Sequence, residues 1–309
     1  MTSLLGRSSS AIDWISDRYR PSAGPFAVLR ILFAVYVLVR PRDIGWISAM
    51  SVVAYSPPPG PFALIPGPAP EFITTGLEVL RAILAICVLF GWNTRMTSGL
   101  LSLVLVTCSG LAYSYGKVDH VILYDLAPLM LGLAGWGSAW SIDSRRRKSV
   151  HTNGYALFLY GTVIAFGMLT AAVAKSATGW LDPARQATRF FVAEAALSPR
   201  SGPFTDLFLR IDNGIFWKLL DYATLLIEGG LILAVFIPIL FRLGLLIMGM
   251  FHLGVWALLG IDFHLYVFVY LGFFLIPAAA WRQQCAEVWA FVRHVWKLTV
   301  RKEQSVGLQ

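Results

Sequence analysis

The chain has 309 residues, of which 57% are hydrophobic and only 14% are charged. Its mean hydropathy of +0.67 is too high for an ordinary soluble domain, so the sequence predicts a membrane protein with several spans. A net charge of +8 would suggest nucleic-acid binding in a soluble protein. Here the basic residues lie beside apolar stretches, which indicates membrane topology and contact with anionic membrane lipid, and no nucleic acid is predicted as a partner.

The apolar region 25–280 is expected to form the transmembrane domain, because a bilayer-spanning helix needs roughly 20 mostly apolar residues. About eight spans are predicted, at 25–39, 75–92, 96–115, 120–140, 154–174, 215–237, 243–259 and 261–280. The stretch 44–55 is either a second apolar piece of the first span or a re-entrant segment. Prolines crowd residues 56–70 and exclude a regular helix there, since proline supplies no backbone donor.

Two segments flank this domain and are predicted to lie on the membrane surface. Residues 1–24 have an amphipathic pattern but no continuous apolar stretch and no small-residue cleavage site. Residues 281–309 combine tryptophans at helical spacing with lysine and arginine, which is typical of an amphipathic basic helix in the interface. A short interfacial helix is also expected at 185–197. The predicted fold class is an all-α polytopic membrane protein with interfacial helices and no large soluble domain.

The placement of lysine and arginine predicts the orientation of the chain. With eight spans, the run Arg145–Lys148 and most other basic residues fall on the same side as the two termini. Cytoplasmic loops carry an excess of these residues, so both termini are predicted to be cytoplasmic in a bacterial inner membrane. The span ends that carry His120, Lys175 and His264 then face the extracytoplasmic side.

Ionisable groups inside apolar spans are costly, so each is a candidate functional residue. They are Arg30, Glu78, Arg81, Asp125, Glu228 and His252, with His120, Lys175, Asp262 and His264 at span ends. Purely structural roles are alternatives. Arg30 and Arg81 could pair with Glu78 or Glu228, His120 could simply begin a helix, Lys175 could extend to the interface, and His252 could donate a hydrogen bond between helices. The three cysteines show no zinc spacing, and no metal is predicted.

Several short motifs occur in a fixed order along the chain. They are Leu29-Arg30-Ile31, Asp119-His120-x-x-x-Tyr124, Ser138-Ala-Trp-Ser-Ile-Asp143, Ala174-Lys175 followed after four residues by Trp180, and Phe251-His252. Together they resemble the horizontally transferred transmembrane domain family. That family includes the vitamin K-dependent gamma-carboxylases and proteins similar to sporulation-delaying protein B.

The resemblance implies a quinol-linked base at the extracytoplasmic face. Lys175 would be the base acting on a reduced quinone, menaquinol or vitamin K hydroquinone, with His120 as its hydrogen-bonding partner. A lysine becomes a useful base when an apolar pocket lowers its pKa toward neutrality. Asp119, Tyr124 and Trp180 would help to form the substrate pocket. Glu228 and His252 are further candidate substrate-binding residues, which would line the path in a lipid or small-molecule carrier.

The chain departs from the family pattern in ways that shape this expectation. Ala174 stands where the carboxylase has a second lysine, Asp119 replaces an asparagine, and the large luminal domain has no counterpart. Quinol oxidation or epoxidation, or base chemistry on a small or peptide substrate, is therefore expected rather than carboxylation of a docked protein. Two alternatives stay open: an accessory membrane protein for maturation, export or immunity of a secreted peptide, working with a partner membrane protein, or a lipid or small-molecule carrier.

Overall fold

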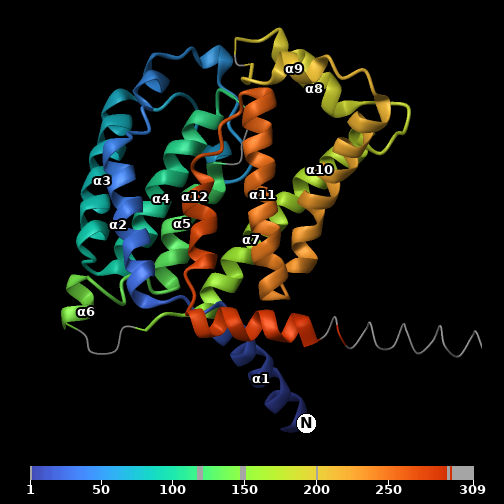
Figure 1. Ribbon diagram of the computed structural model, residues 1–309. Coiled ribbons are helices and arrows are strands. Elements are labelled where there is room, and N and C mark those ends of the chain that lie inside the picture. The colour runs from blue at the N-terminus through green and yellow to red at the C-terminus, as the bar shows by residue number, and fades with distance from the viewer. Residues whose placement is uncertain (1, 117–120, 147–150, 200, 291–292, 294–309) are drawn as a thin grey trace, which may run out of the picture.

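The computed structural model describes residues 2–116, 121–146, 151–199, 201–290 and 293, and this part of the chain is all-helical, without strands. The helices are α1 (Thr2–Tyr19), α2 (Ala23–Val39), α3 (Glu71–Phe90), α4 (Thr94–Tyr113), α5 (Val121–Leu133), α6 (Ile142–Arg146), α7 (Gly154–Lys175), α8 (Ala187–Ala196), α9 (Thr205–Leu209), α10 (Gly214–Ala234), α11 (Pro238–Leu259), α12 (Tyr266–Leu271) and a last helix at 278–290. The long helices form one bundle, with α1 and the helix 278–290 at one end and α8 and α9 at the other (Figure 1).

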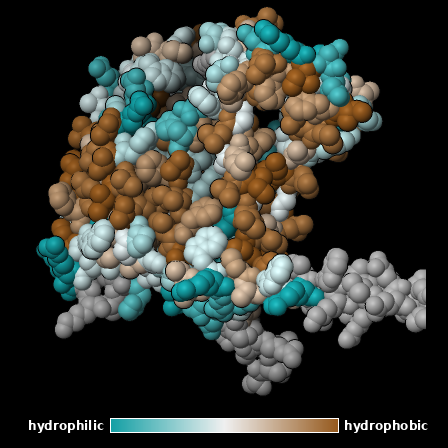
Figure 2. All heavy atoms as spheres, in the orientation of Figure 1, coloured by the Kyte–Doolittle hydropathy of each residue, from teal (hydrophilic) through white to brown (hydrophobic). Residues whose placement is uncertain are grey.

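Four helices of the described chain are long and apolar enough to cross a membrane. They are α3, α4, α7 with its extension to Trp180, and α11, and the bent pair of α1 and α2 would make a fifth. Figure 2 shows hydrophobic residues gathered over the flanks of the helices, and hydrophilic residues are more frequent toward the ends of the bundle. Large apolar patches of this kind mark surfaces that water does not cover. The architecture of the described residues is consistent with an all-α membrane protein, and the number of eight spans stays a prediction.

The remaining expected spans differ from simple apolar helices. Helix α10 has the length of a span but carries three buried charged residues, described below. The described part of the expected span 120–140 is the 13-residue α5, which contains Pro128 and ends at Leu133. The stretch 44–55 forms two short 3₁₀ turns. The short helix expected at 185–197 is confirmed as α8, and its position at the membrane interface stays a prediction.

The segment expected as a span at 261–280 is only partly helical. It contains α12 and a 3₁₀ turn at Gly272–Phe274, and the last helix begins at residue 278. The segment nevertheless runs the length of α2, since His264 bonds Tyr36 near one end of α2 and the Leu275 carbonyl accepts from Ser22 before the other. Glycine within the segment and Pro277 after it explain why no continuous helix forms.

Helix α1 approaches the start of α7 at a glycine. A Cβ atom on Gly154 would lie 1.8 Å from the Ser16 carbonyl oxygen and 2.5 Å from the Arg20 nitrogen. Only glycine permits backbones to approach this closely. The contact fixes the surface segment to the end of the bundle that also carries α6.

Arg242 joins this end of the bundle to α1 and to the helix 278–290. Its side chain is fully buried. The guanidinium donates to the carbonyl oxygens of Phe273 at 2.7 Å and Arg18 at 2.9 Å and to the side chain of Gln284, and it lies 5.3 Å from the Trp281 ring. One side chain therefore fastens α1, α11 and the helix 278–290 together.

We expect the substitution Arg242→Met to lower the free energy of unfolding by about 3 kcal/mol, because it removes three hydrogen bonds and takes the only side-chain donor shown for the Phe273 carbonyl in the described structure. Thermal unfolding in detergent measures this effect. Arg293→Met, at an exposed position, is the control and should change little. Equal melting temperatures for the two variants would contradict the prediction.

Candidate functional site

Lys175, the predicted base, ends α7 and forms an ion pair with Glu228 of α10. Its Nζ atom lies 2.5 Å from each carboxylate oxygen. The side chain of Glu228 is 7% exposed and that of Lys175 is 27% exposed. Helices α7 and α10 pack against each other, and this packing brings together two residues that are 53 positions apart. Lys175 therefore has a specific partner inside the bundle rather than extending to the interface.

Trp180 lies beside this pair because α7 ends in a wide turn. The turn, Ser176–Trp180, contains Gly179 with a φ of 93°, a conformation that favours glycine. It brings the buried Trp180 ring to 5.6 Å from the Lys175 Nζ atom, within the range of a cation–π interaction. The structure thus places three of the predicted site residues, Lys175, Trp180 and Glu228, in one cluster.

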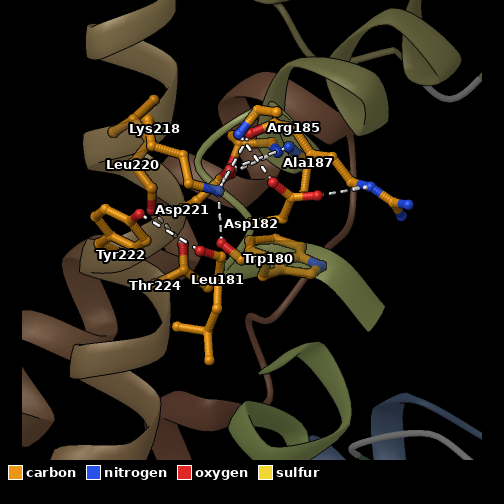
Figure 3. A network of polar contacts seen from close by, with 12 residues as sticks. Trp180, Leu181, Asp182, Arg185, Ala187, Lys218, Leu220, Asp221, Tyr222 and Thr224 are labelled. Carbon is orange, nitrogen blue, oxygen red and sulfur yellow. Dashed lines mark hydrogen bonds and ion pairs between the residues drawn. The ribbon is translucent and has the colours of Figure 1, made fainter. Parts of the chain in front are cut away.

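Lys218 fastens the loop after this turn to α10 (Figure 3). Its ammonium donates to the carbonyl oxygens of Trp180 at 2.6 Å and Arg185 at 3.1 Å, and to the Asp221 carboxylate at 3.1 Å. Three acceptors match the three donors of a lysine. The Lys218 side chain therefore fixes the backbone of Trp180 and so the position of its ring beside Lys175.

Asp221 holds the start of α8 against the same face of α10. The fully buried carboxylate accepts hydrogen bonds from the Ala187 amide at 3.1 Å, the Thr188 amide at 2.7 Å and the Thr188 hydroxyl at 2.7 Å. It satisfies amides that the first turn of a helix leaves without an intrahelical partner. Lys218 and Asp221 were not among the predicted site residues. The available signal was a Lys-x-x-Asp spacing inside an otherwise apolar stretch.

Tyr124 belongs to a different site. It lines a half-open pocket of about 370 Å³. The other lining residues that matter here are Tyr36, Arg40, Arg42, Arg81, Asp262 and His264, and we call this the arginine pocket. Lys175 is not among its lining residues. The resemblance implied one site shared by Tyr124 and Lys175, whereas in the structure Tyr124 lines a pocket to which Lys175 does not contribute.

Two arginines of this pocket are held by carboxylates. Arg42 pairs with the fully buried Asp125 and lies 5.5 Å from the Tyr124 ring. Arg81 pairs with Glu78 at 2.8 Å, which is one of the structural alternatives considered for it. These pairs fix the guanidinium groups at the pocket wall.

Two motif residues have structural roles. The buried Arg30 donates to the carbonyl oxygens of Trp136 at 3.1 Å and Trp140 at 2.6 Å, in the segment that follows α5, rather than pairing with Glu78 or Glu228. The Asp143 carboxylate accepts from the Thr94 amide at 2.6 Å and so satisfies the start of α4. Both residues therefore organise the end of the bundle opposite α8.

His252 lies in an aromatic cluster between α11 and the segment that contains α12. Its ring stacks on Phe263 with 4.1 Å between centroids and lies 4.9 Å from the ring of Tyr266. It does not line the arginine pocket. His120 and Asp119 lie outside the described residues, so their place beside Lys175 stays a prediction.

Within the described ranges, no group of three or more His, Cys, Asp or Glu side chains is arranged to hold a metal ion. No protein-family model, curated protein or solved structure matches the chain. The resemblance to the horizontally transferred transmembrane domain family therefore rests on the short sequence motifs alone.

Proposed function

We propose that this chain is an integral inner-membrane protein in which Lys175 acts as the base on a reduced quinone, menaquinol or vitamin K hydroquinone. The observation that supports this most is the Lys175–Glu228 pair, which is largely buried and lies beside the Trp180 ring. An ionisable pair inside an apolar bundle is costly to keep and is typical of proton-transfer sites. His120 is the proposed hydrogen-bonding partner of the base.

The pair offers a route to a neutral amine. An ammonium with a carboxylate at 2.5 Å can pass a proton to it, which gives a neutral amine and a neutral carboxylic acid. In an apolar surrounding the neutral pair competes with the ion pair, because burial penalises both charges. The Lys175 amine then takes the proton of a quinol hydroxyl while Glu228 keeps the first proton. The flat apolar face of Trp180 suits the quinol ring.

The orientation proposed for the chain places this pair on the extracytoplasmic side. Arg18, Arg20, Arg145 and Arg146 lie in or beside α1 and α6, at the end of the bundle opposite α8 (Figure 1). An excess of such residues is typical of the cytoplasmic side. Both termini would then be cytoplasmic, and a quinol from the bilayer would reach Lys175 near the outer surface.

A second candidate function is an accessory role with a secreted peptide or a partner membrane protein. The observation that favours it is that the two Glu228 oxygens already satisfy Lys175, as they would in a purely structural ion pair. A carrier for lipid or small molecules would need a path lined by Glu228 and His252. Those two residues lie on different helices, α10 and α11, and neither lines the arginine pocket.

The deciding experiment measures oxygen consumption and quinone-epoxide formation with each reduced quinone. Wild type should turn over at least one quinol, and Lys175→Ala should lower the rate by at least about 100-fold, the usual effect of losing a general base. Gel filtration and melting curves would show that both proteins are folded. Folded wild type without turnover on either quinol would refute the enzyme proposal and favour the accessory role.

A further inference from the structure

The arginine pocket has a charge balance that leaves one cation unpaired. Arg42 pairs with Asp125, and Arg81 pairs with Glu78. Arg40 lines the pocket without an ion pair to any residue that the structure describes. The third carboxylate of the pocket, Asp262, bonds His264 instead. The three arginines that line the pocket are balanced by Asp262, which also lines it, and by Asp125 and Glu78, which lie behind Arg42 and Arg81, so the group is neutral as long as His264 is neutral.

A chain of short hydrogen bonds crosses the mouth of this pocket. The Asp262 carboxylate lies 2.6 Å from Nδ1 of His264, and Nε2 of the same ring lies 2.6 Å from the Tyr36 hydroxyl oxygen. The His264 backbone amide also donates to Asp262 at 2.8 Å. Partial burial alone would raise the pKa of Asp262, but the hydrogen bonds from His264, together with the positive charge of Arg40 nearby, outweigh it and hold that pKa below its usual value. Asp262 is therefore an acceptor, and Nδ1 carries a hydrogen.

The protonation of His264 decides what Tyr36 can offer to a ligand. In the neutral ring Nε2 accepts the hydrogen bond, so the Tyr36 hydroxyl hydrogen is used inside the chain. When Nε2 gains a proton it donates to the Tyr36 oxygen, and the hydroxyl hydrogen becomes free for another acceptor. The same proton changes the charge of the pocket from zero to plus one.

We propose that the arginine pocket binds the carboxylate of an organic acid together with one proton, which His264 takes up. Arg40 supplies the unpaired guanidinium, whose planar fork matches a carboxylate, and Tyr36 supplies the hydroxyl donor. The anion balances the positive charge that the proton brings. This site is separate from the Lys175 pair and does not depend on quinol chemistry.

Size and charge favour this class of ligand. A volume of about 370 Å³ lies at the lower end of the range for small-molecule sites. The apolar lining residues Val37, Leu105 and Leu265 and the ring of Tyr124 suit a hydrocarbon or aromatic body attached to the acid. A phosphate monoester carries a charge of about −1.5 to −2 at pH 7, more than the single positive charge available, and it lacks the planar pair of oxygens of a carboxylate.

Titration calorimetry on the full chain in lipid nanodiscs tests this proposal. The probes are benzoate for small aromatic acids, hexanoate for lipid-derived acids, benzamide as the uncharged analogue and inorganic phosphate. Carboxylate affinity should be at least about tenfold higher at about pH 5.5 than at about pH 8. Buffers with different ionisation heats should report about one proton taken up per carboxylate bound at intermediate pH.

Three variants connect the result to named groups. His264→Gln should abolish the pH dependence of carboxylate binding. Arg40→Gln should weaken carboxylate binding by at least about tenfold at both pH values. The control Arg189→Gln, on α8, should change neither the affinity for carboxylates nor its pH dependence. The groups that titrate or carry charge around His264 are Tyr36, Arg40 and Asp262 at the mouth, and Arg42, Arg81 and Tyr124 on the walls with their carboxylates Asp125 and Glu78. Residues 117–120, which precede α5, lie outside the described part.

Several results would overturn the proposal. One is a folded wild-type protein that binds neither carboxylate at either pH. Another is benzamide or phosphate binding as tightly as benzoate, and a third is carboxylate binding without proton uptake. Retention of the full pH dependence in folded His264→Gln would exclude His264 as the group that takes up the proton.

Discussion

Replacing Asp221 by alanine should lower the free energy of unfolding by about 3–5 kcal/mol, which is the usual cost of breaking a buried ion pair from one side. The carboxylate is fully buried, and it pairs with Lys218 while accepting three hydrogen bonds from the start of α8. Alanine leaves the Lys218 ammonium in place without its carboxylate. It also leaves the amides of Ala187 and Thr188 without their acceptor. Thermal unfolding in detergent measures the loss.

A neighbouring ion pair provides the matched control. Asp182 and Arg185 also stand three residues apart, but their side chains are 42% and 69% exposed. Asp182→Ala should therefore change stability by no more than about 1 kcal/mol. In Asp221→Ala the loop between α7 and α8 should also become sensitive to limited proteolysis. If the two variants melted together, Asp221 would not be the anchor of this loop.

The helices that could be predicted from the sequence are those whose formation depends on one property, the hydropathy of a long stretch of residues. Long apolar runs gave α3, α4, α7 and α11 with boundaries within a few residues, because length and hydropathy alone decide whether a helix can cross a bilayer. The short helix α8 was also expected near its observed place. Periodicity and composition carry this information locally, without knowledge of the partners.

The segments that depend on tertiary contacts were predicted less well. The charges of α10 become tolerable only because Lys218, Asp221 and Glu228 meet partners inside the bundle. The segment 261–280 lies along α2 without forming one continuous helix, and its hydropathy does not reveal this. Hydropathy measures the free-energy cost of placing a segment in the membrane without its partners, whereas ion pairing and packing decide its final conformation.

In the candidate sites, too, the individual residues could be predicted from the sequence, whereas their contacts with one another could not. The sequence indicates Lys175, Glu228 and Trp180 individually, because an ionisable residue or a tryptophan stands out in or beside an apolar span. It does not indicate the pairing of Lys175 with Glu228, since the packing of α7 on α10 determines that contact. It indicates Asp262 and His264 only as ionisable residues at a span end. Their alignment with Tyr36 into one hydrogen-bonded chain required the folded structure.

Exchanging the two charges of the candidate base should separate stability from turnover. The double variant Lys175→Glu with Glu228→Lys keeps a cation and an anion between α7 and α10 at the same helix contact. Each single substitution places two like charges together in a largely buried site, and we expect each to cost several kcal/mol. The double variant should recover to within about 1 kcal/mol of wild type, as a double-mutant cycle in thermal unfolding would show.

In the double variant the rate of quinol turnover should stay low although the stability recovers. In the exchanged protein the amine is attached to α10 and no longer to the turn that carries Trp180, so it approaches a bound quinol from a different position. A misplacement of about 1 Å can cost a base about 100-fold in rate. A stable double variant with a quinol rate at least about 100-fold below wild type would identify Lys175 as a base with a required position. A stable double variant that turns over quinol at the wild-type rate would mean that the pair supports the bundle and that the base lies elsewhere.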